Sequence, residues 1–292
     1  MDAGERMTTA PALETEPVTE AAPARRGQTV GAALLTTVRR LLSAIVTLAV
    51  IVGAWVLFLK LFNITPFIGK NPVDIYRYLF EGSDAAASRQ ELFRESGTTL
   101  RDALLGLVAG TIAAVGCSLA FYLSRTASSV FMPLAMVLRS VPLVAMTPLI
   151  VAIFGRNLAA ITIISGIVTF FPTLVNMIVA LRGTPQESLD LCRAYGASAV
   201  KTLMKVQIPT ALPALFASLR IAAPLALVGA LLAEWLATGQ GLGYGLLNAA
   251  AASDYNGLWA RVVLITLYST VIYQLVGIAE GLVMRRFGSA AK

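Results

Sequence analysis

The sequence has 292 residues, of which 57% are hydrophobic and 13% are charged, where a soluble domain carries roughly 25% charged residues. This composition predicts a membrane protein. The net charge of +7 is spread over the ends of apolar segments, which excludes a nucleic-acid-binding face. Histidine is absent, which removes the commonest general base and metal ligand, so we expect no catalytic and no metal site.

The chain begins with residues 1–28, which are rich in Ala, Pro, Glu and Thr and lack apolar periodicity. We expect this segment to be a disordered cytoplasmic tail, without the apolar core of a signal peptide. We expect residues 29–292 to form one membrane domain. Six apolar runs approach the ~20 residues that span a bilayer. These predicted spans are Leu41–Leu59, Ala103–Leu123, Val130–Phe154, Leu158–Leu181, Leu212–Leu236 and Leu258–Met284.

The segments between the spans decide the orientation. The segment Asn63–Asp102 is of mixed charge, and we expect it to be extramembrane, with an amphipathic helix over Gln90–Thr99. Basic residues gather at the opposite ends of the spans, among them Arg40, Arg125 and Arg182. Because Lys and Arg favour the cytoplasmic side, we expect a multi-pass membrane protein with both termini in the cytoplasm.

A charged elbow, residues 184–209, interrupts the apolar runs on the cytoplasmic side. Thr184 and Glu187 have the spacing of a capping box around the start of a helix. Gly196 breaks that helix and can take a left-handed conformation. A second amphipathic helix then stops before Pro209. On spacing alone, this segment could equally be an interfacial helix that lies on lipid.

The segment from Asp190, DLCRAYGASAVKTLMKVQIP, resembles the EAA loop of binding-protein-dependent ABC importer permeases. The matching positions are Asp190, Gly196, Val206, Ile208 and Pro209, whereas Leu191 and Cys192 replace the usual alanines. In that family the elbow docks in a groove of the ATP-hydrolysing subunit. The resemblance therefore assigns ATPase coupling to Glu187, Asp190, Arg193, Ala194, Tyr195, Gly196, Ala197 and Ser198.

Residues 138–155, 170–183 and 212–247 extend this resemblance to the subfamily that imports sulfonates, taurine and nitrate. The resemblance implies an all-α, six-helix type I ABC importer permease fold. It also implies two ABC ATPase subunits, which carry ATP and Mg, and an extracytoplasmic solute-binding protein that delivers a small polar or anionic solute. A second permease copy, most simply in a homodimer, and membrane lipid complete the partners, and this chain itself binds no cofactor.

Polar residues inside the spans are candidates for the translocation pathway. Arg139 and Arg220 either attract an anion or have a structural role, by snorkelling or through an internal pair that shapes the inner gate, and Glu234 is equally ambiguous. Ser165, Thr169, Thr173 and Asn176 recur at helical spacing on the fourth span. This seam either lines the pathway or forms hydrogen bonds between helices.

Three other functions are weaker interpretations. The segment TGQGLGYG at 238–245 has glycines in alternation, but it follows an apolar span rather than a strand, and no P-loop lysine accompanies it. A secondary transporter would show inverted repeats and discontinuous helices, and we find no internal repeat. A membrane scaffold or sensor would not require nucleotide.

Overall fold

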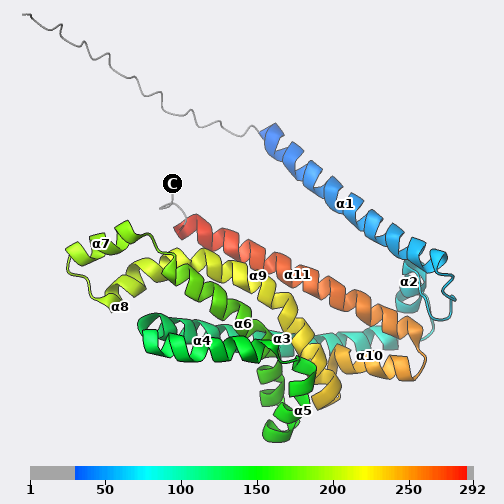
Figure 1. The fold of residues 1–292 in the computed structure, drawn as a ribbon. Coiled ribbons are helices and arrows are strands. Elements are labelled where there is room, and N and C mark those ends of the chain that lie inside the picture. Colours follow the sequence, from blue (N-terminus) through cyan, green and yellow to red (C-terminus); the bar gives the residue numbers. More distant parts are fainter. Residues whose placement is uncertain (1–29, 288–292) are drawn as a thin grey trace, which may run out of the picture. The chain divides into compact units, whose positions relative to one another are not determined.

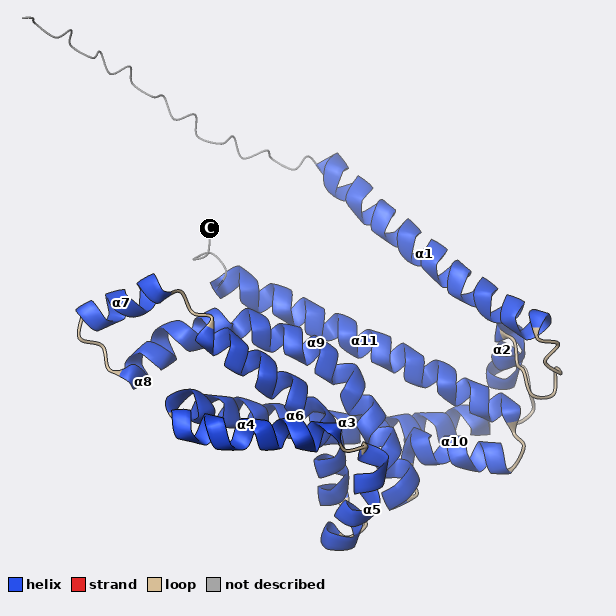
Figure 2. Ribbon diagram, in the orientation of Figure 1, coloured by secondary structure: helices blue, strands red, loops and turns tan. Residues whose placement is uncertain are grey.

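The computed structural model describes residues 30–287, and every element in this range is helical. Figure 2 shows helices joined by short loops, with no strand among the residues that it describes. The predicted all-α class is therefore confirmed. The predicted tail, residues 1–28, lies outside the described residues.

The described residues fall into two units that divide between Leu57 and Phe58. Helix α1 (Val30–Leu61) contains the first predicted span, and its segment Ile45–Leu61 is apolar. The second unit holds the other helices (Figure 1). In chain order they are α2 (Pro72–Phe80), α3 (Ala85–Leu123), α4 (Arg125–Ser140), α5 (Leu143–Phe154), α6 (Leu158–Arg182), α7 (Gln186–Ala194), α8 (Ala199–Thr202), the π-helical turn η1 (Leu203–Gln207), α9 (Ile208–Ala233), the π-helical turn η2 (Glu234–Thr238), α10 (Gly241–Ala251) and α11 (Tyr255–Phe287).

Helix α3 joins two segments that the sequence analysis kept apart. The predicted amphipathic helix Gln90–Thr99 and the second span Ala103–Leu123 form one uninterrupted helix of 39 residues. At the junction, Arg101 Nη2 donates to Asp102 Oδ1 at 2.8 Å, so the two opposite charges pair within the helix. The predicted helix over Gln90–Thr99 is therefore confirmed, and it continues directly into the second span.

The third predicted span is broken rather than continuous. Helices α4 and α5 bend by 105° at the segment between Ser140 and Leu143. Val141 precedes Pro142 and has an extended backbone, because a residue before proline is disfavoured in the helical region. The apolar run Val130–Phe154 is therefore two helices.

The predicted number of six spans is not confirmed within the described residues. Four helices are long and apolar enough to cross a membrane, and the bent pair of α4 and α5 brings the number to five if it counts as one span. These four are Ala85–Leu123, Leu158–Arg182, Ala199–Thr238 and Tyr255–Arg285. The α1 segment Ile45–Leu61 is apolar but shorter.

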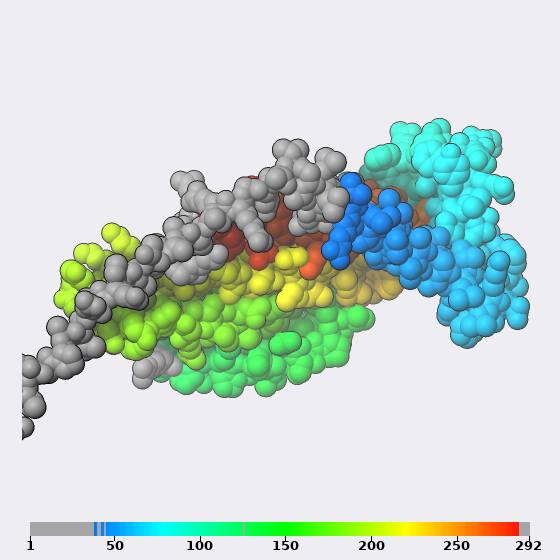
Figure 3. Space-filling model, turned by 90° about the horizontal axis from the view of Figure 1, so that it is seen from above, coloured from blue at the N-terminus to red at the C-terminus, as the bar shows by residue number. Residues whose placement is uncertain are grey.

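The core of the second unit forms where α3, α6 and α9 pack together. Small side chains let these helices approach closely, and Ala103, Ala226 and Ala230 meet Leu227 in one buried cluster. Figure 3 shows α9, in yellow, next to the green surface of the helices that precede it. In Figure 1, α7 and α8 project from one end of this unit, whereas α5 and α10 lie at the other end.

Candidate functional site

The elbow consists of α7 and α8, and neither helix contains a buried residue. The predicted capping box at its start is wrong. The Thr184 hydroxyl donates to the carbonyl of Leu181 at 3.1 Å, so it completes the end of α6 instead. Pro185 takes the N-cap position of α7, with no side-chain cap.

Gly196 has the predicted left-handed conformation, with φ of +67°. The Gly196 N–H donates to the carbonyl of Arg193, and the Ala197 N–H donates to that of Cys192, both at 2.9 Å. These two bonds form a Schellman motif at the end of α7. A Cβ added to Gly196 would meet no atom within 4 Å. Only the backbone conformation, and not crowding, therefore favours glycine here.

The residues predicted to couple to the ATPase form an open surface. Of the eight, seven are exposed and Ala197 is half-buried. Tyr195 is 83% exposed, and the apolar side chains of Leu191 and Met204 are 59% and 60% exposed. The charges Asp190 and Arg193 pair with each other at 2.8 Å. The elbow thus presents apolar side chains beside a neutralised ion pair, which is typical of an interaction surface.

The second helix of the elbow does not stop before Pro209, as the sequence analysis predicted. The chain runs unbroken from Ala199 to Thr238, through η1 into α9. The Ile208 N–H donates to the carbonyl of Leu203, five residues earlier, so the wide turn accommodates the proline near the start of α9. Gln207 is buried and donates to the hydroxyl of Tyr122 on α3. The elbow is therefore mechanically continuous with the fifth predicted span.

Three residues of the polar seam on α6 are fully buried, and all three form hydrogen bonds to backbone carbonyls. Ser165 donates to Ala226 of α9 at 2.8 Å. Thr169 donates to Gly166 at 2.9 Å and to Gly106 of α3 at 3.3 Å, and Thr173 donates to Thr169 at 2.9 Å. Asn176, the fourth member, is half-buried. The geometry of the three buried residues favours the packing alternative.

Two glycines of α3 explain why the seam packs so closely. A Cβ on Gly106 would lie 2.1 Å from Ser165 Oγ, and one on Gly110 would lie 2.0 Å from Thr169 Oγ1. Gly106 and Gly110 form a GxxxG pair, which allows close approach of helices in membranes. The sequence analysis missed this signal, although it is visible in the letters GLVAG.

Arg139 and Arg220 do not meet. Arg139 lies in the last turn of α4 and is exposed. Arg220 lies on α9 and donates to Glu280 Oε2 and to the Tyr273 hydroxyl of α11, both at 3.1 Å, with its guanidinium 4.7 Å from the Tyr273 ring centroid. The structure thus forms an internal pair for Arg220, but with a carboxylate that the sequence analysis overlooked. Glu280 is the one acidic residue in the sixth predicted span.

Glu234 is fully buried and explains the glycine-rich segment. Its Oε2 accepts a hydrogen bond from the Gly243 N–H at 2.7 Å, while Thr99 Oγ1 accepts one from the Leu242 N–H at 2.9 Å. A Cβ on Gly241 would lie 2.3 Å from Glu234 Cδ. The first N–H groups of α10 therefore already have acceptors from the chain, and the glycines make room for them. This arrangement leaves no support for a nucleotide site.

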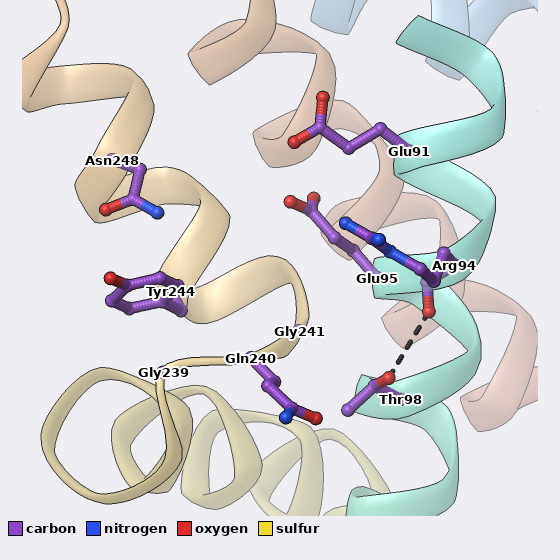
Figure 4. A pocket seen from close by; sticks show the side chains of 9 residues that line it. All are labelled: Glu91, Arg94, Glu95, Thr98, Gly239, Gln240, Gly241, Tyr244 and Asn248. Carbon is purple, nitrogen blue, oxygen red and sulfur yellow. Dashed lines mark hydrogen bonds between the residues drawn. The ribbon is translucent and has the colours of Figure 1, made fainter. Parts of the chain in front are cut away.

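A polar pocket of about 440 Å³ lies beside this segment, between α3 and α10 (Figure 4). Glu95, which lines this pocket, accepts hydrogen bonds at both oxygens from the buried Arg261 of α11, at 2.8 and 2.9 Å, and Glu91 lies 3.4 Å from the same guanidinium. This pair was missed because its partners are 166 residues apart. The described residues contain no group of three or more Cys, Asp or Glu side chains that could hold a metal ion.

Comparison with known proteins places this architecture in a family. Residues 106–289 match the family described as binding-protein-dependent transport system inner membrane component. A probable ABC transporter permease protein of Haemophilus influenzae is 30% identical over 80% of this chain and 93% of that protein. A putative aliphatic sulfonates transport permease protein, SsuC, of Bacillus subtilis is 25% identical over 80% of this chain and 83% of that protein.

A solved structure shares the fold. The chain resembles the inward-facing MetNI methionine ABC transporter with a TM-score of 0.52 and 20% identity, over 70% of this chain and 99% of that one. The family match, the apolar helices and this fold agree with one another. The chain therefore belongs to the binding-protein-dependent ABC permeases, as the multi-pass, non-catalytic transmembrane subunit of a type I ABC importer, whose family relies on separate ATPase and solute-binding partners.

Proposed function

We propose that the elbow is the docking surface for an ABC ATPase subunit, which binds the ATP and Mg. This proposal rests on the exposed apolar side chains of the elbow. Large exposed apolar surfaces outside the spans mark sites where a partner binds and covers them. Gly196 sets the direction of the projection through its Schellman motif. The proposed contact residues are Glu187, Asp190, Arg193, Ala194, Tyr195, Gly196, Ala197 and Ser198.

The continuity of α8, η1 and α9 supports a coupling role for this surface. A displacement of α8 reaches α9 without crossing a loop, and α9 packs on α3 and α6. We propose that closure of the ATPases moves α9 and α6 as a rigid body. The rival explanation, an ion-gradient-driven carrier, has no comparable support.

Substituting Gly196→Val tests the docking. A β-branched residue at φ of +67° costs roughly 1–3 kcal/mol of backbone strain, so the elbow should change direction while the spans remain packed. The importer is purified with its ATPase and binding protein, and ATPase retention and solute-stimulated hydrolysis are measured. We expect both to fall at normal permease abundance.

The control is Gly97→Val, at an exposed glycine of α3 where an added Cβ meets nothing and φ is not positive. It should leave ATPase retention and stimulation unchanged. If Gly196→Val retains and stimulates the ATPase as the wild type does, the elbow is instead an amphipathic segment that lies on lipid.

We propose further that two permease copies form a homodimer in the bacterial inner membrane, surrounded by lipid and with both termini in the cytoplasm. The described end of α11 lies at the same end of the unit as the elbow (Figure 1), which supports this orientation for the C-terminal side. A cysteine at the exposed Ser198 should be labelled from the cytoplasm, and one at the exposed Ser83 from outside. Labelling at position 198 from outside would show that the proposed membrane orientation is inverted.

We propose a small anionic or polar solute that an extracytoplasmic binding protein delivers. The relative that is named for aliphatic sulfonates supports an anion. Of the predicted pathway residues, Arg139 and Asn176 remain available to face the solute. Ser165, Thr169, Thr173, Arg220 and Glu234 have partners within the chain, so a direct role in the pathway would require those contacts to open.

A further inference from the structure

A cavity of about 1110 Å³ lies under the elbow. Residues of α4, α7 and α8 line it, together with the ends of α3 and α6 at Leu123 and Arg182. Its volume exceeds the ~300–1,000 Å³ of ordinary small-molecule sites. Because two of the long apolar helices end here, the cavity lies at the level where a bilayer passes from hydrocarbon to headgroups.

One wall of the cavity is basic and rich in hydrogen-bond donors. Arg182 and Arg193 line it with Gln186 and Ser128, and Arg182 Nη2 donates to Ser128 Oγ at 2.7 Å. Among the described side chains of the lining, none is acidic. The carboxylate that pairs with Arg193, on Asp190, is not part of this lining.

The other wall is apolar. Met132, Pro133 and Met136 of α4 line it, and flexible methionines adapt to ligands of irregular shape. Apolar and basic walls thus share one cavity at the end of the spans.

We propose that this cavity binds one anionic phospholipid. The phosphate lies against the guanidinium of Arg182, which can donate to two phosphate oxygens at once, and Gln186 adds a donor. An acyl chain follows Met132, Pro133 and Met136 along α4. A free anion would satisfy the basic wall but would leave the methionines facing water, which is why we favour a lipid. The anionic lipids of the cytoplasmic leaflet give it a negative surface potential that attracts basic residues. The assignment of the lipid to this leaflet rests on the proposed orientation.

The test measures lipid retention on the assembled importer by native mass spectrometry. The complex is titrated with phosphatidylglycerol, with phosphatidylcholine or with inorganic phosphate. We expect phosphatidylglycerol to bind at least about tenfold more tightly than phosphatidylcholine, and Arg182→Gln to lower its affinity by about tenfold, as expected for a lost charge-assisted contact. Lys201→Gln is the control, because Lys201 is exposed on the same elbow but does not line the cavity.

A second variant keeps the test decisive if Arg182→Gln fails to assemble. Gln186→Glu adds a negative charge at the first residue of α7, where the helix dipole favours an acidic residue, so folding should be preserved while phosphatidylglycerol binding falls. Equal binding of the two lipids, or unchanged binding in Gln186→Glu, overturns the proposal. If inorganic phosphate binds as tightly as phosphatidylglycerol, the proposal of a lipid is wrong and the cavity binds a free anion. ATPase stimulation, measured in parallel, separates this result from the docking of the elbow.

Discussion

The close packing of α3 on α6 predicts a large effect from adding a single methyl group, Gly110→Ala. The new Cβ would lie 2.0 Å from Thr169 Oγ1 and 2.4 Å from the Gly166 carbonyl oxygen. Thr169 could rotate, but the Gly166 oxygen belongs to the backbone. The two helices must therefore separate by more than half an ångström before the contact becomes acceptable.

The free-energy change follows from three terms. Overpacking costs about 1–3 kcal/mol, and the loss of the Thr169 bond to Gly106 costs about 1 kcal/mol. The higher helix propensity of alanine returns about 1 kcal/mol. We therefore expect Gly110→Ala to destabilise the permease by about 1–3 kcal/mol.

The matched control is Gly116→Ala, on the same helix, where an added Cβ meets nothing within 4 Å. This substitution should change the free energy of unfolding only through the higher helix propensity of alanine. The midpoint of thermal unfolding, followed by fluorescence-detected size-exclusion chromatography in detergent, should fall for Gly110→Ala and stay level or rise for Gly116→Ala. A Gly110→Ala protein as stable as the wild type would refute the interpretation of the seam as a packing interface.

Three further substitutions examine a buried ion pair and the predicted pathway. Glu95→Gln should destabilise the protein by about 3–5 kcal/mol, because the buried Arg261 would keep only the more distant, half-exposed Glu91; an unchanged unfolding midpoint would show that this ion pair is dispensable. Thr173→Phe should reduce the amount of assembled complex, since this hydroxyl is fully buried, whereas Asn176→Phe should reduce solute uptake at normal assembly. Proportional losses of uptake and assembly in Asn176→Phe would exclude a pathway role.

The sequence predicts best where a signal is local. The fourth span was expected over Leu158–Leu181, and α6 covers Leu158–Arg182, because an unbroken apolar run follows Asn157, whose side chain caps the helix. The left-handed Gly196 was equally accessible, since a glycine between two amphipathic segments is a common helix end. Both depend only on neighbours in the chain.

The sequence predicts poorly where the deciding partner is distant. The polar seam has helical spacing whichever surface it faces, and only the position of α3 shows that it meets glycines. Likewise, Arg220 could be identified as unusual but not paired, because Glu280 is 60 residues away. The capping box at Thr184 failed for a local reason, since the Thr184 hydroxyl donates to the carbonyl of Leu181 at the end of α6 and Pro185 takes the N-cap position of α7.

The π-helical turn η1 sets the angular phase between the elbow and the membrane core. A π turn accommodates about one more residue than an α turn, and one residue corresponds to about 100° of rotation around a helix axis. In a regular α-helix, one extra residue would turn the elbow through about that angle relative to the packed face of α9, and the wide turn between Leu203 and Gln207 absorbs it. The orientation of the proposed coupling surface therefore depends on this wide turn, separately from the residues that form the surface and from those that form the core.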